Sequence, residues 1–240
     1  MNETANADLF TTDPSRLFIY YNAREIDPEM EDNITDDGSV NRLAMKSLKQ
    51  FGVCSDGTDP FIIKEDRATR PVENINTPPT PEAYAEAKAV QVLKYCGLDP
   101  DYPDEEESNA TEDERNTAGA TTLQNLKQCL TEGYPVVFGF TFYWDSPPWE
   151  TDTEIYYLLP SLDDDQRHKP PPKDENGKAF GGHTVLAIGY DDNTGQVLCR
   201  NSWGKEREKP GLFYMTYDWI TDWEATNDFW TLRVIQSDDQ

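Results

Sequence analysis

The stretch GGHTVLAIGY (residues 181–190), followed by CRNSWG (residues 199–204), decides the fold. Its two glycines and His183 stand directly before an apolar run that is typical of a β-strand. The residues DDNTG (191–195) indicate a turn, so residues 196–201 are predicted to form the second strand of a hairpin. We therefore expect His183 and Asn201, which lie at the ends of these two strands, to come together.

These two residues form a candidate catalytic pair. An asparagine amide can accept a hydrogen bond from one imidazole nitrogen and fix the tautomer, so that the other nitrogen faces a thiol. Trp203 would then shield the pair from water. The other histidine, His168, lies in the charged, proline-rich stretch DQRHKPPP (165–172), and we interpret it as solvent-exposed. A histidine at the start of a strand is more often structural than catalytic, so the prediction depends on the combination.

The rest of the chain divides into a part with helix-like residue patterns and a part with strand-like patterns. Short runs rich in Val, Ile, Phe and Tyr, separated by turn residues, predict strands at 135–142, 184–190, 196–201, 212–217 and 231–235. Before them, apolar spacing predicts helices at 40–51, ended by Gly52, and at 81–95 and 122–133, whereas residues 14–24 indicate a buried helix or strand. The sequence therefore predicts an α+β layout, with a helical lobe over residues 1–114 and a β-rich lobe over residues 115–240.

The two quoted stretches are similar to the His and Asn motifs of papain-family cysteine peptidases, in residues and in spacing. The downstream stretch GLFYMTYDWI (211–220) agrees, and PSRLFIYYNAR (14–24) and GVC (52–54) resemble the divergent, often microbial, members. The resemblance runs from about Pro14 to Ile235. It implies a papain-like fold of two lobes, the second an antiparallel β-barrel-like lobe, and cleavage of peptide bonds through a thioester.

The same resemblance assigns roles and exposes a departure. In the family a cysteine at the N-terminus of a long helix is the nucleophile, and a glutamine shortly before it completes the oxyanion hole. His183 would shuttle the proton and Asn201 would orient the imidazole. The 13 residues before Pro14 contain neither cysteine nor glutamine. We therefore expect the segment with the nucleophile to be missing and the helical lobe to be truncated.

None of the four cysteines is a convincing substitute for the nucleophile. We interpret all of them as structural: Cys54, Cys96, Cys129 and Cys199. Two hypotheses follow. The first is a peptidase whose N-terminal segment is absent from this sequence, and the second is an inactive pseudopeptidase that binds proteins or peptides in the old substrate groove. An abrupt start inside the expected catalytic helix favours the first.

The net charge of the chain excludes some classes of binding partner. The chain has 21 basic and 46 acidic residues, a net charge of −25 and a pI near 4.2. Such a polyanion repels phosphate backbones and anionic lipid headgroups, so we expect a peptide or protein substrate and neither nucleic acid nor membrane. The acidic blocks at 101–107 and 163–165 are interpreted as solvated surface.

Several other features are expected to be absent. The apolar stretches are far shorter than the about 20 residues that a membrane helix needs, and no signal peptide is recognisable, which favours the cytoplasm. We therefore interpret the sequons at Asn2, Asn33 and Asn109 as chance occurrences. The cysteines are few and far apart, and no pair has metal-ligand spacing, so neither a disulfide framework nor a metal or organic cofactor is expected.

Overall fold

The chain after Pro14 forms a helix rather than a strand. In the computed structural model, which describes residues 13–30, 34–61, 75–100, 111–141, 149–150, 156–158, 182–202, 211–222 and 225–237, helix α1 spans Arg16–Glu25. The Ser15 hydroxyl caps the helix by accepting a 2.9 Å hydrogen bond from the backbone N–H of Phe18. Leu17, Phe18 and Tyr21, at helical spacing, are all buried.

Two further helices and a short 3₁₀ turn belong to the same part of the chain. They are η1 (Pro28–Met30), α2 (Asn41–Phe51) and α3 (Pro81–Ala87). Helix α2 stops at Gly52, as predicted, because the φ of 79° at Gly52 is not helical. The residue must be a glycine, since a Cβ there would lie 1.9 Å from the carbonyl oxygen of Ala87. A small core of Phe18, Cys54, Ala83 and Ala87 joins α1 to α3, and Phe51 at the end of α2 packs against it.

The predicted helix over residues 81–95 is wrong in its second half. Helix α3 ends at Ala87, and Val90–Gly97 forms strand β1. Val90 and Val92 are β-branched and alternate in sequence, which suits a pleated strand. The alanine-rich start of the segment favours a helix, so local propensity does not indicate where that helix ends. The strand lies at one end of the sheet and is paired with the last strand of the chain.

The second half of the chain supplies most of the sheet and two more helices. Helix α4 (Glu112–Thr131) starts ten residues before the predicted helix, with Thr111 and Glu114 forming a capping box. The remaining elements are β2 (Val136–Thr141), β3 (Trp149–Glu150), β4 (Tyr156–Leu158), β5 (Gly182–Asp191), β6 (Gln196–Arg200), β7 (Leu212–Thr216), α5 (Tyr217–Thr221) and β8 (Thr226–Ser237). The five predicted strands all correspond to strands of the structure.

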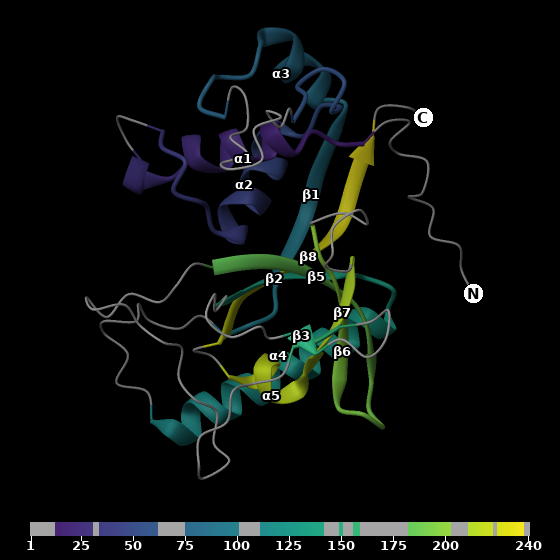
Figure 1. Cartoon of the computed structure of the whole chain (residues 1–240). Helices are drawn as coiled ribbons and strands as arrows, with labels where there is room; N and C mark the ends of the chain where they lie inside the picture. The colour runs from purple at the N-terminus through teal and green to yellow at the C-terminus, as the bar shows by residue number, and fades with distance from the viewer. Residues whose placement is uncertain are drawn as a thin grey trace. The chain divides into compact units, whose positions relative to one another are not determined.

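The sheet is largely antiparallel. Its strand order is β1-β8-β2-β5-β6-β7-β4-β3, and only the β4–β7 pair is parallel among the pairings recorded for the described strands. The order has two ends, so these strands form an open sheet and not a closed barrel. Helices α4 and α5 lie side by side and contact strands β2, β5 and β7 (Figure 1). The predicted α+β class is confirmed.

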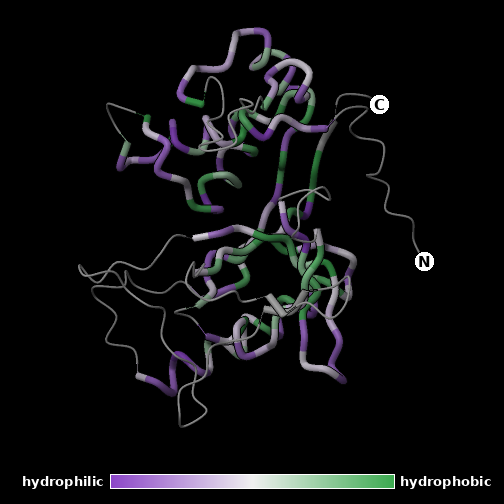
Figure 2. Tube along the Cα trace, in the orientation of Figure 1, coloured by the Kyte–Doolittle hydropathy of each residue, from purple (hydrophilic) through white to green (hydrophobic). Residues whose placement is uncertain are grey.

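The main core lies between these two helices and the sheet. Apolar segments run along the central strands (Figure 2), and their fully buried side chains include Phe138, Val136, Val197, Phe213 and Met215. The alternating burial of β2 residues shows that one face of that strand points into the core. Cys129 and Cys199 also belong to this core, as expected for structural cysteines.

The chain divides into two compact units. One contains Met1–Tyr95 together with Leu232–Gln240, and the other contains Cys96–Thr231. Strands β1 and β8 each cross the boundary between the units. The predicted lobes, residues 1–114 and 115–240, stay a prediction.

Candidate active site

His183 lies near the start of β5, directly opposite an aromatic residue of the neighbouring strand. The antiparallel register pairs His183 with Phe140 of β2. The two rings form a T-shaped contact, with centroids 5.6 Å apart and an interplanar angle of 79°. The imidazole is partly buried, because it is covered on this side by the edge of the core.

Asn201 follows β6 and is held by its own backbone. Its N–H donates a 2.8 Å hydrogen bond to the carbonyl oxygen of Gly211, and the residue is only 7% exposed. Strands β5 and β6 pair as a hairpin, as predicted, and this pairing brings the two side chains together. His183 Nε2 lies 2.9 Å from Asn201 Oδ1, a hydrogen-bond distance.

The orientation of the Asn201 amide can be read from its second contact. The backbone N–H of Ser202 donates a hydrogen bond of 2.7 Å to the same Oδ1 atom. A backbone N–H can only donate, so the amide atom at this point must be the oxygen and not the nitrogen. It follows that Nε2 of neutral His183 carries the proton and donates it, and that Nδ1 carries the lone pair.

The electrostatic environment keeps the imidazole neutral. Burial lowers the pKa of His183 from its ordinary value of 6.5, and the hydrogen bond to Asn201 opposes this effect only in part. A neutral ring with its lone pair on Nδ1 can accept a proton from a nearby acid. The pair can therefore act as a general base at neutral pH.

The far end of the hairpin is anchored as well. Asp192, in the turn between β5 and β6, forms an ion pair with Lys127 of α4 and accepts a 2.9 Å hydrogen bond from the Tyr217 hydroxyl of α5. The Lys127 ammonium also lies 5.1 Å and 5.4 Å from the ring centroids of Tyr190 and Tyr217. The hairpin that carries the His–Asn pair is thus fixed to the two helices beneath the sheet.

Three of the four cysteines are unsuited to nucleophilic attack. Cys54, Cys129 and Cys199 are at most 4% exposed. Burial raises the pKa of the Cys54 thiol to about 12, and it also raises the pKa of the Cys199 thiol, although Cys199 stands only two residues from Asn201. Cys96 is partly exposed in β1 and not at the N-terminus of a helix. Trp203 and His168 lie outside the described residues.

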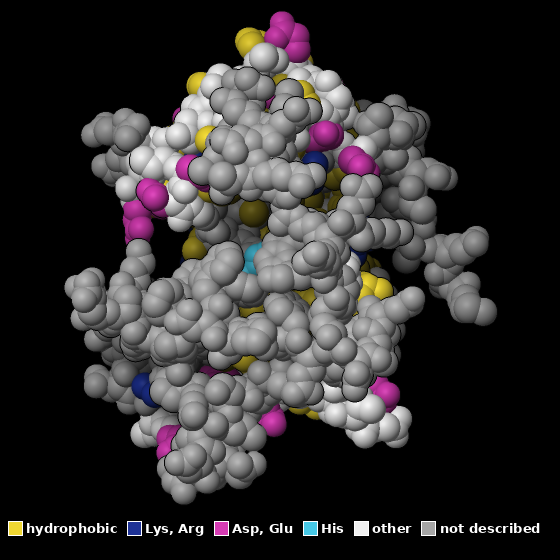
Figure 3. All heavy atoms as spheres, viewed as in Figure 1, with side chains coloured by type: hydrophobic (Ala, Val, Ile, Leu, Met, Phe, Trp, Pro, Cys, Tyr) yellow, Lys and Arg dark blue, Asp and Glu magenta, His cyan; other side chains and the backbone are white. Residues whose placement is uncertain are grey.

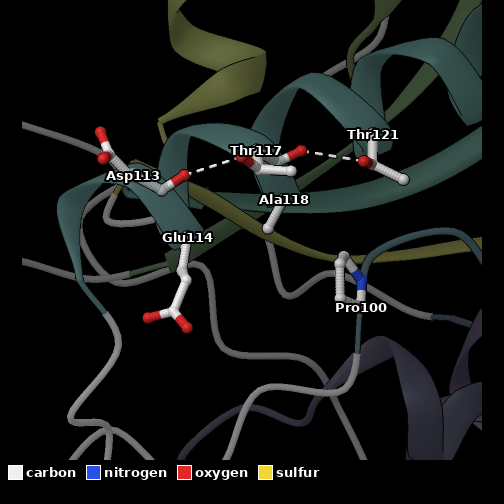
Figure 4. Close-up of a pocket in the computed structure, with 6 residues that line it drawn as sticks. All are labelled: Pro100, Asp113, Glu114, Thr117, Ala118 and Thr121. Carbon is white, nitrogen blue, oxygen red and sulfur yellow. Dashed lines mark hydrogen bonds between the residues drawn. The ribbon is translucent and has the colours of Figure 1, made fainter.

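A shallow pocket near the start of α4 is not a second candidate site. It is lined by Pro100, Asp113, Glu114, Thr117, Ala118 and Thr121 (Figure 4). The Thr117 and Thr121 hydroxyls donate to backbone oxygens one turn earlier in the helix, at Asp113 and Thr117. Glu114 accepts from the cap residue Thr111. The helix itself uses these polar groups, and they do not converge on a ligand.

The described residues contain no group of three or more His, Cys, Asp or Glu side chains placed to hold a metal ion. Nor does any helix in the described part of the chain have the length and apolarity needed to cross a bilayer.

Two sequence comparisons relate this chain to proteins described as peptidase-like. The model of the Peptidase_C39 like family matches residues 89–231, which is more than half of the chain. An uncharacterised peptidase C1-like protein of Acanthamoeba polyphaga mimivirus is 28% identical over 223 residues, which cover 92% of this chain. This chain spans 59% of the length of that relative.

Similarity to solved structures identifies the fold. Xylellain, a cysteine protease from Xylella fastidiosa, is 29% identical, with a TM-score of 0.60 over 92% of this chain and 70% of xylellain. The cysteine protease and lectin-like domains of Cwp84, a surface layer associated protein of Clostridium difficile, match with a TM-score of 0.54. That match covers 97% of this chain and 44% of the other, and its 18% identity supports the fold alone. The papain-like fold inferred from the motifs is confirmed.

Proposed function

The chain belongs to the Peptidase_C39 like family, and from this premise we propose that His183 and Asn201 are the general base and the orienting residue of a cysteine-type peptidase. The observation that carries the proposal is the hydrogen bond of 2.9 Å between His183 Nε2 and Asn201 Oδ1. The same bond leaves Nδ1 as the nitrogen that takes part in proton transfer.

The proposed reaction is hydrolysis of a peptide bond in two steps. Nδ1 of His183 removes the proton of a cysteine thiol, and the thiolate attacks the carbonyl carbon of the peptide. The imidazolium, stabilised through Asn201, then gives that proton to the leaving amine, which breaks the C–N bond and leaves a thioester. Water, deprotonated by the same nitrogen, hydrolyses the thioester and regenerates the thiol. The substrate is accordingly a peptide or protein, and Trp203 is proposed to shield the pair.

The reacting thiol is proposed to come from a segment outside these 240 residues. Cys54, Cys129 and Cys199 are buried, and the caps that begin the described helices are Ser15, Val40, Thr80, Thr111 and Thr216. A catalytic thiolate needs an exposed, electropositive position such as a helix N-terminus. This chain would therefore supply the histidine and asparagine of the site.

The test is an assay with fluorogenic peptides, applied to the 240-residue chain and to any longer form encoded by its gene. We expect the longer form to cleave peptides and the short form to be inactive. His183→Ala should reduce kcat by at least about 10³-fold, because the base is lost, and Asn201→Ala by about 10–10²-fold. His168→Ala is the matched control and should leave kcat unchanged.

Two outcomes would contradict the proposal. One is activity of the longer form that survives His183→Ala. The other is hydrolysis by the 240-residue chain with selective alkylation of Cys199, which would indicate a relocated nucleophile. If the gene encodes only these residues and the protein binds peptides without cleaving them, the pseudopeptidase hypothesis replaces this one.

A further inference from the structure

We propose that Phe140 is a positioning residue, which holds the imidazole plane of His183 in the orientation that brings Nε2 to Asn201. The inference rests on the proposed function for its catalytic meaning, but not for its geometry. Phe140 stands directly opposite His183 in the β2–β5 register, and the two rings are in T-shaped contact. Cross-strand pairs of this kind contribute specific side-chain interactions in a sheet.

The hydrogen bond to Asn201 cannot fix the imidazole by itself. It locates one ring atom, Nε2, whereas the plane of the ring can still tilt about that atom through the two side-chain torsions of His183. A second contact at a different part of the ring removes this freedom. Phe140 provides such a contact, at a centroid distance of 5.6 Å and an angle of 79°.

Phe140 is suited to this role because its own ring is fixed. It is 3% exposed and lies within aromatic contact distance of two other core residues: Phe213, with centroids 6.4 Å apart, and Trp219, with centroids 6.3 Å apart at 86°. Its backbone is paired on both sides, with His183 of β5 and with Thr226 of β8. A close-packed ring in a doubly paired strand is a rigid surface for the imidazole.

The chain offers a matched control two residues earlier. Phe138 lies on the same face of β2, is fully buried and stacks on Phe229 with a centroid distance of 4.8 Å and an angle of 3°. In the β2–β5 register it faces Val185 and not His183. Phe138→Leu and Phe140→Leu therefore remove a similar core volume from the same strand, but only the second removes the contact with the imidazole.

The experiment is nitrogen and proton NMR of the histidine side chains in the 240-residue chain. The sequence has only two histidines, so His168→Gln assigns the signals of His183. In the wild type we expect a single tautomer with a slowly exchanging Nε2 proton. In Phe140→Leu we expect both tautomers. We also expect the Nε2 proton to exchange with water at least about fivefold faster, which corresponds to the loss of one hydrogen bond. Phe138→Leu should keep the wild-type signature. If Phe140→Leu does not fold, Phe140→Met is the milder variant.

Two results would overturn the inference. Phe140→Leu or Phe140→Met with an unchanged tautomer and exchange rate would show that Phe140 only fills the core. An equal change in Phe138→Leu would show that general loosening of the strand is the cause. In a longer, active form, Phe140→Leu should lower kcat with little change in KM. Because the NMR result does not require turnover, failure of the proposed peptidase activity would be recognised separately.

Discussion

At the scale of single residues, the Asn201 side chain shows how the backbone determines the chemistry of a site. Its Oδ1 atom accepts from the Ser202 backbone and from the His183 ring at the same time. The backbone contact fixes which end of the amide faces the histidine, and the amide in turn fixes the imidazole tautomer. The sequence predicted the pair of residues, because the turn between their strands is local.

The lowered pKa of His183 makes stability depend on pH. In the folded protein the pKa lies below the ordinary value of 6.5, so the unfolded chain binds the proton more strongly. The contribution of the neutral histidine is present above pH 6.5 and is lost as the pH falls through the folded-state pKa. We expect the unfolding free energy of the wild type to fall more steeply below pH 6.5 than that of His183→Gln, in urea titrations at several pH values. Parallel curves for the two proteins would contradict the shift, and His168→Gln serves as the control.

Arg24 is a buried cation whose hydrogen-bond partners, among the described residues, are neutral oxygens. Its guanidinium is fully buried and donates to the carbonyl oxygens of Tyr20, Thr35 and Ile75 and to the side-chain oxygen of Asn76. Its carbon centre also lies 3.9 Å from the centroid of the Tyr20 ring. The guanidinium carries five N–H donors in a planar fork, so it can donate to several oxygens at once.

Removing this group should therefore be costly. Arg24→Met would leave buried carbonyl oxygens without donors, and we expect a loss of about 2–4 kcal/mol in the free energy of unfolding. Arg16→Met, on the exposed side of the same helix, is the control and should cost less than about 1 kcal/mol. Denaturant titration of both variants measures the difference. Equal losses would show that the buried hydrogen bonds of Arg24 have no special weight.

At the scale of elements, a helix or strand can be predicted from the sequence to the extent that its pairing partners lie nearby in the chain. The hairpin of β5 and β6 was predicted correctly, since its strands and turn are adjacent in sequence. Local sequence predicts a helix where β1 forms, because the partner strand β8 lies about 130 residues further along the chain and leaves no local signal. The early start of α4 was missed, although its capping-box residues Thr111 and Glu114 were a readable signal.

The contact between His183 and Phe140 was also missed. The alternating pattern of residues 135–142 indicates a strand with a buried face, but not which residue of another strand stands opposite it. That information is the register between β2 and β5, which the tertiary structure sets. Patterns of residues can therefore identify the chemically special side chains, whereas the residues that support them depend on pairings beyond local reach.

The packing of α4 on α5 depends on a glycine. A Cβ at Gly119 would lie 2.0 Å from the backbone oxygen of Thr221, so the two helices touch at this point without a side chain between them. Alanine normally favours a helix over glycine by about 1 kcal/mol. Here we expect Gly119→Ala to destabilise the protein by about 1–3 kcal/mol, because backbone must move.

Thermal unfolding followed by circular dichroism measures this effect. The control is Thr121→Ala, at an exposed position of the same helix, which should change stability by less than about 0.5 kcal/mol. A stabilising effect of Gly119→Ala would mean that helix propensity outweighs the contact and that α4 and α5 are not closely packed in solution.

At the scale of the whole molecule, the dominant property is charge. With a net charge of −25 the chain repels itself, and the described acidic side chains are scattered over the face shown in Figure 3. Within the described part of the chain, the ion pair of Lys127 and Asp192 opposes this repulsion locally, and its side chains are 28% and 60% exposed. A pair this exposed contributes little beyond its own hairpin.

Salt should therefore stabilise the protein. Raising NaCl from about 0.05 to about 0.5 M shortens the Debye length and screens the repulsion among the acidic groups. We expect the Tm to rise in differential scanning calorimetry. The rise in Tm should be slightly larger in Lys127→Met, because this variant lacks the ion pair with Asp192 that salt would weaken. A Tm that falls with salt would mean that specific ion pairs, rather than overall repulsion, dominate the electrostatics.

The first unit is discontinuous in sequence, and this affects the order in which the two units can fold during synthesis on the ribosome. Its residues come from both Met1–Tyr95 and Leu232–Gln240, while all of Cys96–Thr231 belongs to the other unit. A ribosome releases the chain from its N-terminus, so the inserted unit leaves the exit tunnel before the first unit has received its last strand residues. Cys96–Thr231 can therefore fold while the first unit is still incomplete, because that unit also needs Leu232–Gln240.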